Sequence, residues 1–223
     1  MHKPILTLFA CLLFAFASFK ALSQDEEILT GYQNQIGINT TFFFKQFLNF
    51  SDNNSIDVSP YIVTYKLISP KNNAFRMDVG GMLSNKTETF SNGAPPRKTN
   101  TQELDLSVGY EKRQPLSERW LCFFGADAVA HIESAKTVAE DINETVTTTT
   151  KTNRYGAGPV VGIQFNISKR VSLFTETALL FQSSTASFET TFKNNPQFND
   201  KETTKETAIS FVVPTSLFLA INL

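Results

Sequence analysis

Strand-like segments joined by connections that alternate between long and short constrain the fold of this chain more than any other feature. The short connections lie at about 69–74, 113–118 and 168–170. The long, polar ones lie at about 49–59, 85–102, 134–153 and 183–206. An up-and-down barrel in a membrane has this alternation, because one rim carries tight turns while the other carries extended loops.

The segments between these connections are rich in threonine, phenylalanine, valine and isoleucine, which strands prefer. We expect strands at about 33–48, 60–68, 75–84, 103–112, 119–133, 154–167, 170–182 and 207–223. Two prolines, Pro159 and Pro214, fall inside these segments. Because proline removes a hydrogen bond from the ladder, we expect each to lie at a bulge or close to a rim.

The two faces of the expected strands differ in size and polarity. In the fourth segment, large apolar residues alternate with small or charged ones: Leu104, Leu106, Val108 and Tyr110 against Asp105, Ser107, Gly109 and Glu111. A soluble barrel such as a lipocalin places its apolar face inside. A narrow membrane barrel places it outside, against lipid. The sequence therefore predicts an all-β fold, an eight-stranded antiparallel up-and-down transmembrane β-barrel.

The N-terminus has the pattern of an export signal. Lys3 precedes a short apolar run, and small residues lead up to Ser23, so we expect residues 1–23 to be a signal peptide cleaved before Gln24. Residues 24–223 would then form one barrel domain in the outer membrane of a Gram-negative bacterium. A buried N-terminal helix is the alternative interpretation.

Charge and cysteine content exclude some classes of function. Residues 1–23 hold Lys3 and Lys20 and no acid, so cleavage changes the net charge from −1 to −3. This weak charge gives no indication of a nucleic-acid partner. Cys122 is the single cysteine after residue 23, so we expect no internal disulfide. Neither a cofactor motif nor metal-ligand spacing is recognisable.

Several segments resemble the outer-membrane β-barrel family common in Bacteroidota, which includes the PorT-like proteins. The resemblance is carried by 155–162 (YGAGPVVG), 167–176, the hairpin from Ser59 to Gly81, and the terminal segment 217–223. It implies a barrel in contact with outer-membrane lipid and lipopolysaccharide, assembled by the barrel assembly machinery. It also implies secretion-system proteins as partners.

Strand alternation places a set of ionisable side chains on the inward face. These lumen residues are Lys66, Arg76, Asp78, Asp105, Glu111, Asp127, His131, Glu133 and Glu176. An eight-stranded barrel has an interior just wide enough for side chains to fill. The charges therefore form a salt-bridged plug, or else a narrow proton or ion path or a small-ligand site.

Two further groups of residues are candidates for specific roles. An aromatic girdle at the membrane interfaces is expected from Phe43, Phe44, Phe47, Tyr110 and Trp120. A base, an acid and a hydroxyl occur together at His131, Glu133 and Ser134. Strand alternation points His131 and Ser134 to opposite faces, which disfavours a nucleophile and base pair.

These observations favour a non-enzymatic protein with a structural or surface-interaction role, in which four extracellular loops contact any external ligand. Three alternatives remain open at this stage. They are an accessory component of a secretion or assembly pathway, a narrow porin-like pore, and a lipid-modifying barrel enzyme.

Overall fold

A computed structural model of the chain describes residues 33–41, 61–90, 95–140, 144–214 and 216–223. The expected cleavage site at Ser23 and Gln24, the girdle residues Phe43, Phe44 and Phe47, and the 49–59 connection lie outside the described residues. The strands are β1 Gln33–Asn39, β2 Tyr61–Ile68, β3 Asn73–Glu88, β4 Arg97–Pro115, β5 Trp120–Glu140, β6 Thr145–Asn166, β7 Val171–Phe192, β8 Asp200–Val212 and β9 Phe218–Asn222. A short 3₁₀ helix, η2 (Pro196–Phe198), precedes β8.

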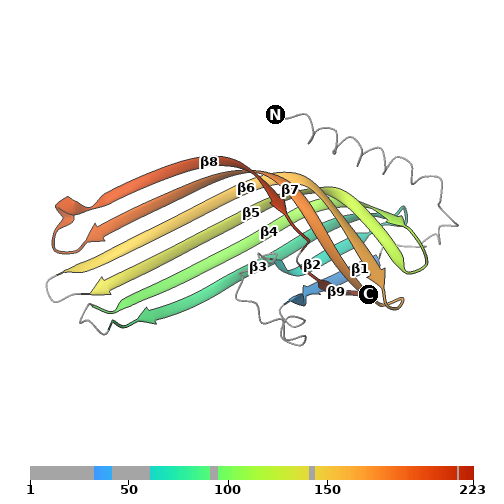
Figure 1. Cartoon of the computed structure of the whole chain (residues 1–223), viewed down its shortest axis with the longest axis horizontal. Helices are drawn as coiled ribbons and strands as arrows, with labels where there is room; N and C mark the ends of the chain where they lie inside the picture. Colours follow the sequence, from blue (N-terminus) through green and yellow to red (C-terminus); the bar gives the residue numbers. More distant parts are fainter. Residues whose placement is uncertain (1–32, 42–60, 91–94, 141–143, 215) are drawn as a thin grey trace.

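The described strands form one antiparallel sheet that closes on itself. Each strand from β1 to β7 pairs with its neighbour in sequence. The C-terminal strand β9 pairs with β7 on one side and with β1 on the other. The expectation of an all-β, antiparallel fold is thus confirmed, with a ring-like sheet (Figure 1). No helix in the part of the chain that the structure describes is long and apolar enough to cross a membrane.

The prediction of one terminal strand over 207–223 is wrong. This stretch belongs to two strands, β8 and β9, so the described sheet has nine strands and not eight. Pro214 lies in the break between them. Opposite β7, the register changes across the break, from Ala178↔Val212 to Phe174↔Phe218. A proline lacks the N–H that a ladder needs, which explains why the strand ends here.

Pro159 behaves differently from Pro214. It lies inside β6 and pairs with Ala126 of β5, far from either end of the strand. On the β7 side, pairing stops after Ala157 and resumes at Val160 in the same register. The ladder is therefore interrupted at Pro159 without a bulge, contrary to the expectation of a bulge or a rim position.

Three of the expected long loops are mostly strand. The 85–102 segment contains the end of β3 and the start of β4, 134–153 contains the ends of β5 and β6, and 183–206 contains most of a β7–β8 hairpin. Polar sequence indicates exposure to water, but it does not exclude a strand. The threonines in these segments favour extended backbone, so the hairpins continue far beyond the ring.

The sheet consequently has two regions. The ring is short because β1 has 7 residues and β2 has 8, whereas β5, β6 and β7 have 21 or 22. The distal parts of β3 to β8 form an open, curved sheet, which we call the extension (Figure 1). Its lateral strands are β3 and β8. The short turns after β2, β4 and β6 lie at the opposite end, near Leu223.

The interior of the ring contains an aromatic core beside its charged residues. Phe123, Phe174 and Phe218 are almost completely buried, and the rings of Phe174 and Phe218 stack with centroids 4.8 Å apart. Gly162 faces this core, where an added Cβ would lie 2.1 Å from the Phe123 ring. The small inward residues thus make room for large ones on neighbouring strands.

Candidate functional site

Six of the nine predicted lumen residues come together around Arg76 in the middle of the ring. Their strands point alternate side chains inward, and the register sets Arg76 of β3 beside Lys66 of β2. We call this set the central ion cluster: Lys66, Arg76, Asp78, Glu111, Asp127 and Glu176.

Arg76 is the hub of the central ion cluster. Its Nη2 lies 2.7 Å from Glu176 Oε1 and 3.0 Å from Asp78 Oδ2, both at hydrogen-bond distance. Its Nη1 lies 3.6 Å from Glu111 Oε2, and its Nε lies 3.5 Å from Asp127 Oδ1. One guanidinium therefore links side chains of β3, β4, β5 and β7, with 1% of the arginine exposed.

Lys66 connects the central ion cluster to the aromatic core. Its Nζ donates a hydrogen bond to Glu111 Oε2 at 2.8 Å, and both side chains are fully buried. The same ammonium lies 4.0 Å from the centroid of the Phe123 ring and 4.5 Å from that of Phe174. A desolvated cation over aromatic faces gains favourable electrostatic energy. Ions and rings together fill the ring at this level.

Sequence analysis missed Arg113, which also faces the interior. It is 5% exposed, and its Nη2 donates a hydrogen bond to Gln164 Oε1 at 3.0 Å, while its Nε lies 3.9 Å from Glu111 Oε1. Arg113 shares the parity of Glu111. The strand expected from sequence ends at residue 112, which places Arg113 in the following turn. Extending the inward and outward alternation of the fourth strand beyond residue 112 would have identified Arg113 as an inward residue.

The remaining three predicted lumen residues form a separate group farther along β4 and β5. His131 Nδ1 lies 2.8 Å from Asp105 Oδ1, while His131 Nε2 lies 3.8 Å from Glu133 Oε2. Sequence analysis missed a fourth member, Glu103, whose Oε1 lies 3.8 Å from His131 Nδ1. Glu103 is the first residue of the expected strand 103–112, and its parity with Asp105 is the signal that identifies it as inward-facing.

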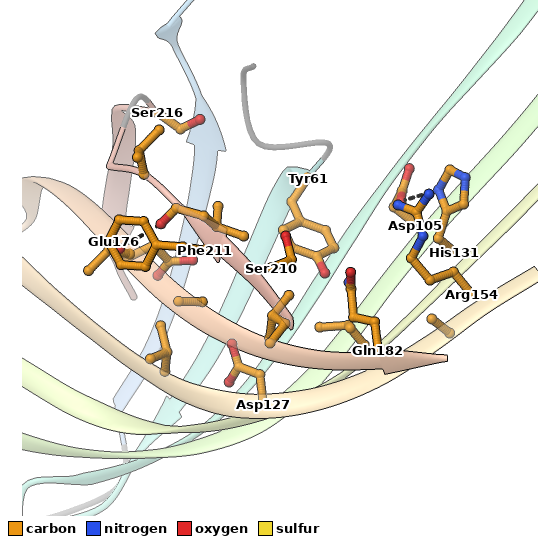
Figure 2. Close-up of a pocket in the computed structure, with 18 of the residues that line it drawn as sticks. Tyr61, Asp105, Asp127, His131, Arg154, Glu176, Gln182, Ser210, Phe211 and Ser216 are labelled. Atoms are coloured by element: carbon orange, nitrogen blue, oxygen red, sulfur yellow. Dashed lines mark hydrogen bonds and ion pairs between the residues drawn. The ribbon is translucent and has the colours of Figure 1, made fainter. Parts of the chain in front are cut away.

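A cavity of about 400 Å³ lies between the two groups. Asp105 and His131 line one part of it, Asp127 and Glu176 line another, and the β8–β9 break contributes Ser216 (Figure 2). Tyr61 and Arg154 also line the cavity. The ring interior is therefore filled near the aromatic core and hollow toward the extension.

The outward face holds the described members of the predicted girdle. Tyr110 is 56% exposed and Trp120 is 44% exposed. Trp120 packs against Phe165, with ring centroids 4.8 Å apart, near the short turn that joins β4 and β5. Cys122 forms no disulfide within the described residues.

The predicted base and hydroxyl do not meet. The β4–β5 register runs without interruption through His131 and Ser134, so these two side chains alternate to opposite faces. His131 pairs instead with Asp105. This arrangement provides no nucleophile with an adjacent base.

Comparisons with known proteins give little beyond this geometry. The chain matches no protein-family model and no curated protein sequence. Among solved structures, that of Acinetobacter baumannii CarO is similar at 7% sequence identity, covering 89% of this chain and 98% of that one, with a TM-score of 0.29. A likeness this weak supports no statement about function.

Proposed function

We propose that the chain is a small, non-enzymatic outer-membrane β-barrel protein whose hairpin extension forms a surface for contacts outside the cell. The observation that carries this proposal is the polarity of the ring, which is reversed relative to a soluble protein. Its interior holds a buried cluster of ionisable side chains beside the three phenylalanines, and large apolar side chains cover its exterior.

Strand β3 illustrates the reversal most clearly. Its inward residues Arg76 and Asp78 are 1% and 2% exposed, whereas the outward residues Phe75, Met77 and Val79 are 48%, 47% and 41% exposed. Large outward apolar residues recur around the ring: Ile36, Ile38, Leu104, Leu106, Val108, Tyr110, Phe124, Ile163 and Ile221. A soluble monomer rarely exposes a contiguous apolar surface of this extent. A bilayer would cover it.

Closure of the sheet also supports the proposal that a lipid bilayer surrounds the ring. A strand edge in hydrocarbon leaves backbone N–H and C=O groups without partners, at a cost of several kcal/mol each. Pairing of β9 with β1 removes such an edge from the ring. In contrast, the described part of the extension has two lateral strands, β3 and β8, with an edge that is not paired to another strand there. The extension is also rich in polar side chains, which suits exposure to water.

The filled interior favours a structural role over a pore. Phe123, Phe174 and Phe218 pack across the ring, and Lys66 lies over two of these rings. We expect no stepwise single-channel conductance from the purified protein in planar bilayers. The accessory role in secretion stays a prediction from sequence resemblance. No contact among the described residues favours it.

Epitope tags at the two ends of the molecule test the proposal. One tag is inserted at the β7–β8 tip, between Asn194 and Asn195, and a matched tag is inserted in the β4–β5 turn at 116–119. In intact Gram-negative cells, an antibody should label the first tag. The second should be labelled only after the outer membrane is permeabilised. Labelling of the turn but not the tip, or recovery of the protein in the soluble periplasmic fraction, would contradict the proposal.

A further inference from the structure

Four ionisable residues face one another where β4 and β5 enter the extension. The register pairs Glu103 with Glu133 and Asp105 with His131. Carboxylates directly opposite each other on one face of a sheet repel. Three acids thus surround one imidazole, separate from the Arg76 hub. Arg154 of β6 lies opposite His131 in the register and lines the same cavity, and the three carboxylates outnumber this one fixed positive charge (Figure 2).

The distances within this group suit metal ligation. One ligand atom from each of Glu103, Asp105 and His131 lies within 4.8 Å of the other two. The imidazole Nδ1 is 2.8 Å from Asp105 Oδ1 and 3.8 Å from Glu103 Oε1. Ligand atoms about 2 Å from a tetrahedral ion are separated by somewhat less than 4 Å, so small side-chain movements would close the site.

An independent observation points into this site. Asp105 is 4% exposed, and its Oδ2 accepts no hydrogen bond from any residue that the structure describes. A buried carboxylate oxygen without a donor costs free energy, unless a ligand supplies the missing interaction. The cavity beside Asp105 and His131 gives a ligand room to enter (Figure 2).

We propose that Glu103, Asp105 and His131 bind a divalent transition-metal cation of the Zn²⁺ class. An imidazole with two carboxylates is a donor set that suits zinc and its neighbours, whereas calcium and magnesium prefer oxygen ligands throughout. Three protein ligands leave the fourth position of a tetrahedral ion open toward the cavity.

Glu133 has a supporting role in this site. Its Oε2 lies 3.8 Å from His131 Nε2, the ring nitrogen that does not face Asp105. A carboxylate that accepts a hydrogen bond from the second ring nitrogen fixes the tautomer and orientation of a ligating histidine. At 3.8 Å the two atoms form no hydrogen bond, so this role requires Glu133 to move closer when the metal binds. Glu133→Gln should therefore weaken metal binding less than loss of a ligand.

Zinc titration of the purified full-length protein tests the inference. The protein is produced without a polyhistidine tag, treated with EDTA and carries Cys122→Ser, so that no thiol at this position competes for zinc. Isothermal titration with ZnCl₂ should show one saturable site. His131→Gln and Asp105→Asn should each weaken binding by about tenfold or more. Glu88→Gln, in an exposed carboxylate of the extension, is the matched control and should keep the parent affinity.

Calcium titration separates a metal site from a general acidic patch. We expect CaCl₂ to bind at least tenfold more weakly than ZnCl₂. Equal affinity for the two ions, or zinc binding that survives both His131→Gln and Asp105→Asn in correctly folded protein, would overturn the inference. Circular dichroism before each titration shows that the variant is folded, and Glu103→Gln supplies a third variant if one of these two fails to fold.

Discussion

The closed ring and the open extension share strands β3 to β7, yet different interactions hold the two regions in place. Inside the ring, Lys66 and Glu111 are fully buried and Arg76 is nearly so. In the extension, by contrast, every residue of β8 from Asp200 to Ile209 is exposed. Because the ring interior is shielded from solvent, the stability of the ring depends on the packing and pairing of each interior side chain. The stability of the extension depends chiefly on backbone hydrogen bonds between strands and on strand propensity.

This difference shows where substitutions should be costly. A charge in the ring is buried among a fixed set of partners, so solvent replaces a lost partner poorly. A charge in the extension, such as Lys86 beside Glu88, has 69% of its side chain exposed and can be solvated if its partner is lost. Similar ion pairs should therefore differ several-fold in their contribution to the free energy of unfolding.

The largest effect is expected for Arg76→Leu. The substitution leaves Asp78, Glu111, Asp127 and Glu176 buried around an apolar side chain, with Lys66 as the nearest remaining cation. Breaking a buried ion pair typically costs about 3–5 kcal/mol. Urea unfolding of the protein folded in detergent or lipid measures this loss.

Lys86→Leu is the matched control in the extension, since it also exchanges a cation for leucine. Its ion pair with Glu88 is exposed and screened by solvent, so the loss of stability should be several-fold smaller than that of Arg76→Leu. Equal losses in the free energy of unfolding for Arg76→Leu and Lys86→Leu would show that the buried cluster stabilises the protein no more than an exposed ion pair does.

A smaller loss of stability is expected when one methyl group is added inside the closed ring of strands. Gly162→Ala places a Cβ 2.1 Å from the Phe123 ring, and overpacking of this kind costs about 1–3 kcal/mol. Phe123→Leu in the same chain should relieve the clash, so the double variant should lose less than the sum of the single ones. In the extension, Ala208→Val should change stability by less than about 0.5 kcal/mol. Unfolding in urea compares all four variants, and strict additivity of the two ring substitutions would exclude the clash.

The smallest effect is expected at the tip of the extension. Glu144 accepts hydrogen bonds from the backbone N–H groups of Asn194 and Thr145 and from the Asn195 side chain. The Asn194 N–H is the main reason that the pKa of Glu144 lies below its ordinary value. A lowered pKa in the folded state means that these bonds stabilise the tip above about pH 4 and are lost as the pH falls through the folded pKa.

Amide hydrogen exchange at Asn194 checks this expectation. Protection should fall in acid for the wild type. In Glu144→Gln it should be weaker than in the wild type at neutral pH and should not vary with pH, while exchange in the ring stays unchanged. Protection at Asn194 that does not vary with pH would contradict the role of Glu144.

Alternation along the strands carries most of what sequence alone can predict about the ring. It indicates the inward face of β2 to β5 and of β7, because a period of two fixes the side of every residue once one is known. It does not show where a strand ends. Arg113 and Glu103 were missed for this reason, since both lie at or beyond the expected ends of the fourth strand.

Polarity misled the prediction of the long connections. The 134–153 segment is rich in threonine and charged residues, a composition that predicts a loop, yet β5 and β6 continue through most of it. A strand exposed to water and a loop exposed to water are equally polar, so only the strand propensity of the residues distinguishes them. Pro214 was a local signal of the break between β8 and β9, but Pro159 shows that proline does not always end a strand.

Fluorescence quenching by brominated lipids tests most directly whether the apolar exterior of the ring faces hydrocarbon. The chain has one tryptophan, Trp120, so Trp120→Phe gives a silent background in which Val108→Trp reports from an outward position of β4. In vesicles, lipids brominated along the acyl chain should quench this tryptophan strongly, and aqueous iodide should quench it weakly. Strong quenching by iodide with none by brominated lipid would contradict the account.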